Sequence, residues 1–268
     1  MSVSASSNGE VLALEGISKS FGPVQALEDV NFSVRAGEVV ALVGDNGAGK
    51  STLIKVISGI HSPDSGRILF GGRPVTIAKP SDAVALGIAT VHQDLALCDN
   101  LDVVANLFLG GEEIEHGAGE VLRSLDETDM ERRSHEVLGS LAVTITDVRN
   151  EVGTMSGGQR QQVAIARSLL GKPRVMILDE PTAALGVRQT AQVLDLIKRL
   201  RDQGQGVVVV SHNLANVFAV ADRIVVLRLG RPAGEFNAAE VSEGTVVAAI
   251  TGADAVAKRN GDVHGGVQ

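Results

Sequence analysis

The sequence predicts an α/β protein with a mostly parallel, doubly wound sheet and a helical insertion in the middle of the chain. Short apolar runs alternate with helical patterns in the first and last thirds of the sequence, which is typical of such a sheet. Between about residues 95 and 170 apolar residues recur at helical spacing instead. With 268 residues, 44% of them hydrophobic, the chain can bury a core of one large domain or two small ones.

The first third reads as five strands and two helices. Strands are expected over 11–17, 27–34, 39–43, 67–70 and 88–91, because these runs are apolar, short and bounded by turn residues. A helix is expected over 49–59, with Leu53, Ile54 and Ile57 on one face, and a short one over 81–86 capped by Ser81.

The insertion is predicted from two clusters of apolar residues, around 103–107 and 137–141, separated by a Gly- and Glu-rich connector over 110–119. After it, helices are expected over 157–170, 189–202 and 214–221, and strands over 174–178, 206–210 and 223–229. Residues 1–10 and 253–268 are small or polar, so we expect them to be disordered around a domain spanning 11–252.

Composition limits the classes of function. The chain has 24 basic and 32 acidic residues, a net charge of −8, which argues against nucleic acid bound through a broad basic face. Its single cysteine, Cys98, cannot form an intrachain disulfide, and the first residues lack the pattern of a secretory signal, so a cytosolic protein is expected. No apolar run approaches the roughly 20 residues that span a bilayer, so work at a membrane would need another subunit.

A glycine-rich loop carries the strongest chemical signal. Its residues fit G-x-x-x-x-G-K-[ST] and lie between an apolar run and a helical pattern: Gly44, Asp45, Asn46, Gly47, Ala48, Gly49, Lys50, Ser51 and Thr52. The glycines let backbone N–H groups converge on phosphate oxygens, Lys50 reaches the β- and γ-phosphates, and the Ser51 hydroxyl can bind Mg²⁺. The alternative, a turn that happens to contain Lys-Ser, does not account for the flanking strand and helix. The loop therefore predicts a site for Mg²⁺ and ATP.

Two carboxylates end the apolar run over 174–178. Asp179 at the end of the predicted strand is placed to hold Mg²⁺, and Glu180 to polarise an attacking water as a general base. Any strand can end in Asp-Glu, so the prediction depends on the phosphate loop upstream.

Ser156, Gly157, Gly158 and Gln159 precede a helical pattern. By their chemistry they form either a second anion site or a helix start with a flexible entry. Phosphate loop, Ser-Gly-Gly-Gln and Asp-Glu occur in the order found in the ATP-binding cassette (ABC) ATPases, and the chain resembles that family over about 11–236. The resemblance implies the ABC ATPase fold: a P-loop NTPase core with an N-terminal antiparallel β part and a helical subdomain over about 95–170.

The resemblance also assigns roles to isolated residues. Gln93 matches the family glutamine that contacts Mg²⁺ and the attacking water and senses the transmembrane partner. His212 matches the histidine that contacts the γ-phosphate. Phe21 stands where the family places an aromatic ring against adenine, although a phenylalanine cannot donate a hydrogen bond. Without the resemblance each would read as a surface polar group or a core ring.

In this family ATP lies between two cassettes, so the resemblance implies a second chain. A homodimer is the simplest form, and a heterodimer stays open. Where the family commonly continues Ser-Ala-Leu-Asp after Glu180-Pro181-Thr182, this chain has Ala183, Ala184, Leu185 and Gly186. The departure leaves open how the two sites are coupled.

That variant is similar to bacterial monosaccharide importers of the ribose, xylose and fructose type. It implies permease partners in the membrane, indirectly a periplasmic sugar-binding protein, and a peripheral position on the cytoplasmic side of the bacterial inner membrane. The alternatives are a soluble cassette ATPase, such as those of iron–sulfur cluster assembly, and a nucleic-acid-handling cassette, which the acidic charge disfavours.

Overall fold

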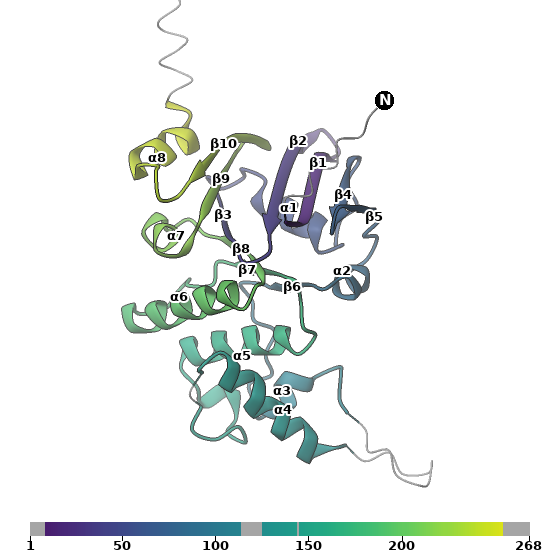
Figure 1. Ribbon diagram of the computed structural model, residues 1–268, viewed down its shortest axis with the longest axis vertical. Helices are drawn as coiled ribbons and strands as arrows, with labels where there is room; N and C mark the ends of the chain where they lie inside the picture. The colour runs from purple at the N-terminus through teal and green to yellow at the C-terminus, as the bar shows by residue number, and fades with distance from the viewer. Residues whose placement is uncertain (1–8, 114–124, 144, 254–268) are drawn as a thin grey trace, which may run out of the picture.

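The structure is a computed structural model that describes residues 9–113, 125–143 and 145–253. It contains two sheets and the helices that cover them (Figure 1). The predicted α/β fold is confirmed, with an antiparallel sheet and a mostly parallel sheet in one chain. Within the described ranges, no helix is both long and apolar enough to cross a membrane.

The first sheet is antiparallel and has the strand order β2-β1-β4-β5. Side chains of its two long strands are buried at intervals and fill the space toward α1, as expected for a sheet with one face on the core. The strands are β1 (Glu10–Phe21), β2 (Val24–Arg35), β4 (Ser65–Phe70) and β5 (Arg73–Val75).

The second sheet has the order β10-β9-β3-β8-β7-β6, and all its neighbouring pairs are parallel except β10 with β9. Its central strands are unbroken apolar runs buried along their whole length, because helices cover both faces. The strands are β3 (Val39–Val43), β6 (Ile88–Val91), β7 (Val175–Asp179), β8 (Gly206–Val210), β9 (Arg223–Arg228) and β10 (Arg231–Asn237).

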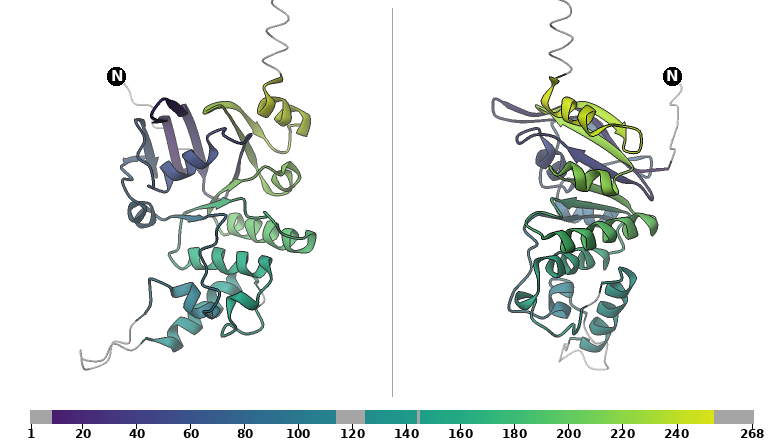
Figure 2. Two further views of the ribbon diagram at one scale, coloured as in Figure 1. Left: turned by 180° about the vertical axis from the view of Figure 1, so that it is seen from behind. Right: turned by 90° about the vertical axis from the view of Figure 1, so that its left-hand side faces the viewer.

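The helices are not spread evenly over the molecule. Figures 1 and 2 show α3, α4 and α5 gathered at one end of the molecule, far from α8 and the antiparallel sheet. The helices are α1 (Lys50–Ile57), α2 (Pro80–Leu86), α3 (Val103–Phe108), α4 (Glu127–Ser140), α5 (Gly157–Leu169), α6 (Val187–Asp202), α7 (Leu214–Val220) and α8 (Glu243–Thr251), with a 3₁₀ turn over Val152–Thr154.

Several details differ from the sequence-based expectations. Ser81 does not cap α2: the helix begins at Pro80, and the Asp82 carboxylate accepts from the backbone N–H of Lys79. Glu10, expected to be disordered, begins β1 and pairs with Arg35. Three elements went unpredicted: β5, β10 and α8. The expected disorder over 1–8 and 254–268 and most of the connector over 110–119 lie outside the described residues.

Candidate nucleotide site

Four segments that carry polar or ionisable side chains meet at one edge of the second sheet. The phosphate loop follows β3, Gln93 follows β6, Asp179 and Glu180 end β7, and His212 follows β8. These four strands are parallel neighbours in the order β3-β8-β7-β6, so their carboxyl ends lie along the same edge. Ligands of open α/β sheets bind at this edge.

The phosphate loop is shaped by glycine. Gly44 has a φ of +152°, and a Cβ there would lie 2.2 Å from the Leu227 carbonyl oxygen. Gly49 has a φ of +104°, and a Cβ there would lie 2.7 Å from the Ala26 carbonyl oxygen. Only glycine fits both the backbone conformation and the space, and the loop then passes directly into α1.

Lys50 points back into this loop. Its Nζ donates to the carbonyl oxygens of Gly44 at 2.7 Å and of Asp45 at 3.0 Å. The loop and the start of β2 form a cavity of about 230 Å³, lined by Val24, Gln25, Ala26 and residues 46–52. The positively charged end of Lys50 and the first N–H groups of α1 therefore share one concave surface, which suits phosphate.

Asp179 is half-buried at the end of β7. Burial raises the pKa of its carboxyl above the ordinary value, and the neighbouring Glu180 carboxylate adds to the increase. Interactions with His92, Lys50 and Lys55 act in the opposite direction and lower this pKa. A carboxylate whose charge is destabilised in this way is a natural partner for a divalent cation, which restores the charge balance.

Glu180 and His212 contact each other. His212 Nδ1 lies 2.9 Å from Glu180 Oε1, and the His212 ring is 74% exposed, whereas the Glu180 side chain is 16% exposed. An ionised carboxylate only accepts, so Nδ1 carries the proton in this contact. Glu180 has a φ of +50°, a left-handed conformation that is uncommon for a residue other than glycine, and its N–H donates to the Val210 carbonyl at 2.9 Å. The strained backbone turns its carboxylate out of the strand toward His212.

Gln93 and Phe21 are less closely tied to the loop. Gln93 is exposed just after β6. Phe21 ends β1, pairs with Val24 in the hairpin, and its ring meets His61 edge-on with the ring centres 5.1 Å apart. Phe21 is 44% exposed and does not line the cavity at the loop. The hairpin residues 24–26 do line it, and the sequence offered no motif that would have identified them.

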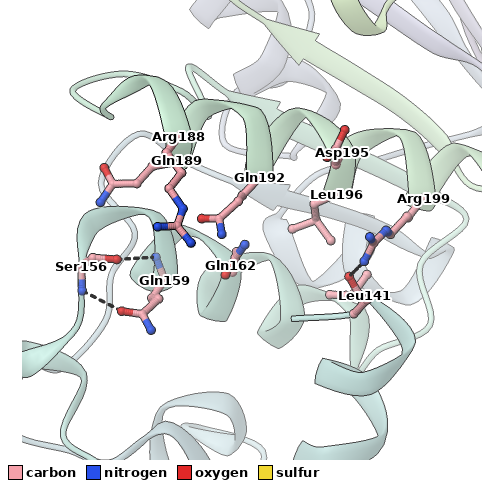
Figure 3. Close-up of a pocket in the computed structure, with 11 residues that line it drawn as sticks. Leu141, Ser156, Gln159, Gln162, Arg188, Gln189, Gln192, Asp195, Leu196 and Arg199 are labelled. Atoms are coloured by element: carbon pink, nitrogen blue, oxygen red, sulfur yellow. Dashed lines mark hydrogen bonds between the residues drawn. The ribbon is translucent and has the colours of Figure 1, made fainter. Parts of the chain in front are cut away.

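Ser156 and Gln159 begin α5 with reciprocal hydrogen bonds. The Gln159 N–H donates to Ser156 Oγ at 3.3 Å, and the Ser156 N–H donates to Gln159 Oε1 at 3.0 Å (Figure 3). Gly158 faces α6: a Cβ there would lie 2.9 Å from Gln189 Cβ. Ser156 and Gln159 line a cavity between α5 and α6, separate from the one at the phosphate loop.

The segment after Glu180 is held by side chains of two helices. Asn216 of α7 donates to Thr182 Oγ1 at 3.0 Å. Gly186 caps the start of α6 and donates its N–H to Gln189 Oε1 at 3.1 Å. Gly186 thus leaves no carboxylate at the position where the resemblance would place an aspartate. Neither Asn216 nor Gln189 stood in a motif that pointed to this role.

Comparison with known proteins identifies the family. A family model described as "ABC transporter" matches residues 27–183. The chain therefore belongs to the ABC transporter family. It is 44% identical over 245 residues to the fructose import ATP-binding protein FrcA of Rhizobium meliloti, covering 91% of this chain and 94% of that protein.

Further relatives carry similar names. The chain is 45% identical to the xylose/arabinose import ATP-binding protein XylG of Sulfolobus acidocaldarius, over 83% of this chain and 86% of that one. It is 43% identical to the ribose import ATP-binding protein RbsA of Chromobacterium violaceum, where 90% of this chain covers 47% of the relative. These relatives confirm the predicted likeness to monosaccharide importers.

Solved structures give the same family and fold. The ADP conformation of MJ1267, an ATP-binding cassette of an ABC transporter, matches with a TM-score of 0.77 at 28% identity and covers 90% of this chain and 95% of that one. The cassette MJ0796, solved as a dimer in a post-hydrolysis state bound to ADP and Pi, matches with a TM-score of 0.69 at 26% identity over 85% of this chain and 98% of that one.

Proposed function

We propose that this chain binds and hydrolyses Mg-ATP as the ATPase subunit of a monosaccharide importer. The observation that carries the proposal is the meeting, at one sheet edge, of the phosphate loop, Asp179 and the Glu180–His212 contact at 2.9 Å. The names of the similar fructose, xylose/arabinose and ribose import proteins support the substrate class. A soluble cassette of iron–sulfur cluster assembly has no such support.

The residues at the loop fit a magnesium-bound triphosphate. The loop leaves no room for a Cβ at Gly44 or Gly49, so its backbone can come close to a phosphate. Lys50 supplies an ammonium group at the surface of the loop. Ser51, Asp179 and Gln93 offer the oxygen ligands that Mg²⁺ prefers. When bound, Mg²⁺ would neutralise charge on the phosphate oxygens. The backbone N–H groups over 44–52 and the Lys50 ammonium would orient the phosphates, and Phe21 would present its exposed ring to adenine.

Glu180 is proposed as the general base. Its carboxylate accepts a proton from an attacking water, and His212 Nδ1–H, which donates to the same carboxylate, orients it. The His212 ring is mostly exposed, so its other nitrogen is free to face the γ-phosphate, the role that the resemblance assigned to it.

A second chain is proposed to complete each site. Ser156 and Gln159 of the Ser-Gly-Gly-Gln segment line a cavity separate from the phosphate loop of the same chain, so one chain supplies two half-sites. The dimer of the similar cassette MJ0796 supports such an assembly. Two copies of this chain would together provide both halves of each site.

A groove between the sheet and the helical subdomain, about 95–170, is proposed as the docking surface for a permease. It has a volume of about 530 Å³ and is bordered by β6, the end of α3 and the end of α5. Val84 and Leu109 lie on it with 66% and 46% of their surface exposed, which suits an apolar helix of a membrane partner. Residues 88–90 of β6 line it and lead directly to Gln93. The chain would then lie at the cytoplasmic side of the bacterial inner membrane, with a periplasmic sugar-binding protein as an indirect partner and no nucleic acid.

Glu180→Gln tests the catalytic part. The amide keeps the size of the side chain but cannot take a proton, so ATP turnover should fall by a factor of about 10²–10⁴. ATP affinity should persist, and ATP should convert the variant from monomer to dimer in sedimentation experiments. Lys50→Ala serves as the matched control, because it should weaken ATP binding itself. Normal turnover by the Glu180→Gln variant would remove Glu180 as the base.

The importer part is tested separately by isolating the chain from membranes. Recovery with an integral membrane subunit, and sugar-stimulated ATP turnover in vesicles that contain it, are expected. Recovery of the chain only in a soluble complex would contradict the importer and leave the ATPase assignment intact.

A further inference from the structure

Gln93 lies in a three-residue span, 92–94, between two anchored points of the chain. On one side, Val91 ends β6 and is in register with Leu178 of β7. On the other side, the carbonyl oxygens of Leu95 and Ala96 accept hydrogen bonds from a side chain of α5. The structure describes all of residues 92–101 and gives them neither helix nor strand. The position of Gln93 therefore depends on how firmly the second point is held.

Arg167, in the last turn of α5, makes both of these hydrogen bonds with one guanidinium. Its Nη1 donates to the Ala96 carbonyl oxygen at 2.8 Å, and its Nη2 donates to the Leu95 carbonyl oxygen at 2.9 Å. A guanidinium presents its N–H donors in a rigid plane and so serves two neighbouring carbonyls at once, whereas a lysine offers one compact ammonium. The two bonds hold a segment in which Ala96 has a φ of +48°, a left-handed conformation that is uncommon for a residue other than glycine.

The charge of Arg167 is kept at this place at a cost. Arg167 is half-buried, and burial lowers the pKa of its guanidinium, an effect that the nearby Cys98 side chain opposes. In the described part of the chain no carboxylate forms an ion pair with it. Taking a charge out of water without a carboxylate partner costs free energy. Such a placement favours a role for this guanidinium at the two carbonyls over simple space filling.

The residues that follow are fixed to the helical subdomain by other side chains. Asn106 of α3 is fully buried, accepts from the Cys98 N–H at 2.8 Å and donates to the Cys98 carbonyl at 2.9 Å. The Asp99 carboxylate pairs with Arg160 of α5 at 2.7 Å, and the Asp99 carbonyl accepts from the Gly153 N–H at 2.9 Å. Among these side chains, the one on the last turn of α5 holds the residues nearest to Gln93 in the chain.

We propose that Arg167 is a positioning residue for Gln93, an inference that rests on the proposed function. By fixing the peptide groups of Leu95 and Ala96, it restricts the places that Gln93 can occupy at the carboxyl edge of the sheet. Arg167 acts through Gln93 and not on the nucleotide itself. When its two bonds are lost, the Gln93 amide is less often in place for Mg²⁺ and the attacking water, so turnover falls while the phosphate loop still binds ATP.

Steady-state turnover and equilibrium binding of ATP by the full chain test the proposal. Arg167→Lys keeps the charge and loses the planar pair of donors, so kcat should fall about tenfold, with the Kd for ATP unchanged. Arg199→Lys is the matched control. Arg199 also donates to a backbone carbonyl, that of Leu141 at 2.6 Å, but it does so from α6 to the end of α4 (Figure 3). This control should keep the kcat of the unmodified chain.

A double-mutant cycle separates positioning from a general loosening of the fold. Gln93→Ala removes the amide that Arg167 is proposed to place, so adding Arg167→Lys to that variant should lower kcat no further. If Arg167→Lys lowers kcat by the same factor with and without the Gln93 amide, Arg167 does not act through Gln93 and the proposal is wrong. A normal kcat in Arg167→Lys alone also contradicts it.

Hydrogen exchange gives a readout that needs no turnover. The reporters are the N–H groups of Ala96, bonded to the Asp94 carboxylate, and of Cys98, bonded to Asn106. Arg167→Lys should speed exchange of both several-fold, while the central strands keep their protection. Unchanged exchange at both would overturn the proposal. If Arg167→Lys fails to fold, Arg167→Gln takes its place, because its amide can still donate to one carbonyl. An unmodified chain without ATP turnover would refute the proposed function instead, and exchange would still decide whether Arg167 holds the segment.

Discussion

Two glycines of the phosphate loop provide a matched pair for testing how much the close contacts around the loop contribute to its stability. Gly47 and Gly49 both have positive φ values, +78° and +104°. A Cβ at Gly47 would meet nothing within 4 Å, whereas one at Gly49 would lie 2.7 Å from the Ala26 carbonyl oxygen and 2.9 Å from Leu27 Cδ2. Replacing either glycine by alanine adds one methyl group to the loop. At position 49 this group would collide with its surroundings, and at position 47 it would not.

The difference between the two variants follows from these contacts. A left-handed conformation costs an alanine about 1 kcal/mol, which is the whole effect expected at Gly47. Gly49→Ala adds about 1–3 kcal/mol, because the Ala26 carbonyl belongs to β2 and cannot move aside like the end of a side chain. For a domain of this size each kcal/mol lowers Tm by about 2–4 °C. We therefore expect a decrease of about 2–4 °C for Gly47→Ala and about 4–16 °C for Gly49→Ala.

Thermal unfolding followed by circular dichroism measures both values at one protein concentration and without nucleotide. Omitting ATP matters because ligand binding stabilises only the folded state and would mix affinity with stability. If both variants melt within about 1 °C of each other, the close contact at Gly49 does not restrain the loop and the reasoning fails.

Two further predictions concern ionisable groups. Burial and the neighbouring Glu180 carboxylate raise the pKa of Asp179, so its ionised form destabilises the fold above that pKa. Asp179→Asn should raise Tm at pH 7 while abolishing Mg²⁺-dependent turnover, and the gain in Tm should vanish below about pH 3.9, where both forms are neutral. Burial of Glu38 acts to raise its pKa, but hydrogen bonds from Arg223 and the Arg35 N–H outweigh burial and lower it. Glu38→Gln should cost about 1–3 kcal/mol at pH 7 in urea unfolding, and the two curves should converge as the pH falls through the lowered pKa; a constant difference at acid pH would contradict this.

The parallel sheet and the site residues at the carboxyl ends of its strands were predicted correctly in position. There the unbroken apolar runs and the motifs that follow them both indicate buried strands that end in a site. The run over 39–43 is apolar throughout and flanked by a glycine loop, so the residue pattern alone assigns it as a buried strand followed by a phosphate site. Asp179, Glu180 and His212 each follow such a run, and parallel pairing brings them together.

The elements that the sequence did not reveal have weak local signals. Strand β10 contains Pro232 and Gly234, both poor strand formers, and forms through its pairing with β9. Helix α8 is apolar on several sides, so its helical period is faint. The Glu180–His212 contact depends on the left-handed backbone at Glu180, which no residue pattern specifies. The cavity between α5 and α6 arises from two segments that begin 30 residues apart, and only packing brings them side by side.

Gln189 serves two segments with different atoms. Its Cβ lies against Gly158 at the start of α5, and its amide oxygen holds the N–H of Gly186 in the segment that follows Glu180. A displacement of α5 relative to α6 would therefore act on the same residue that anchors the turn after Glu180. Within one chain, Gln189 thus joins the start of α5, which holds the proposed half-site for a partner, to the turn that follows the proposed base Glu180. This link consists of a packing contact and a hydrogen bond between uncharged groups, and residue 186 itself is a glycine.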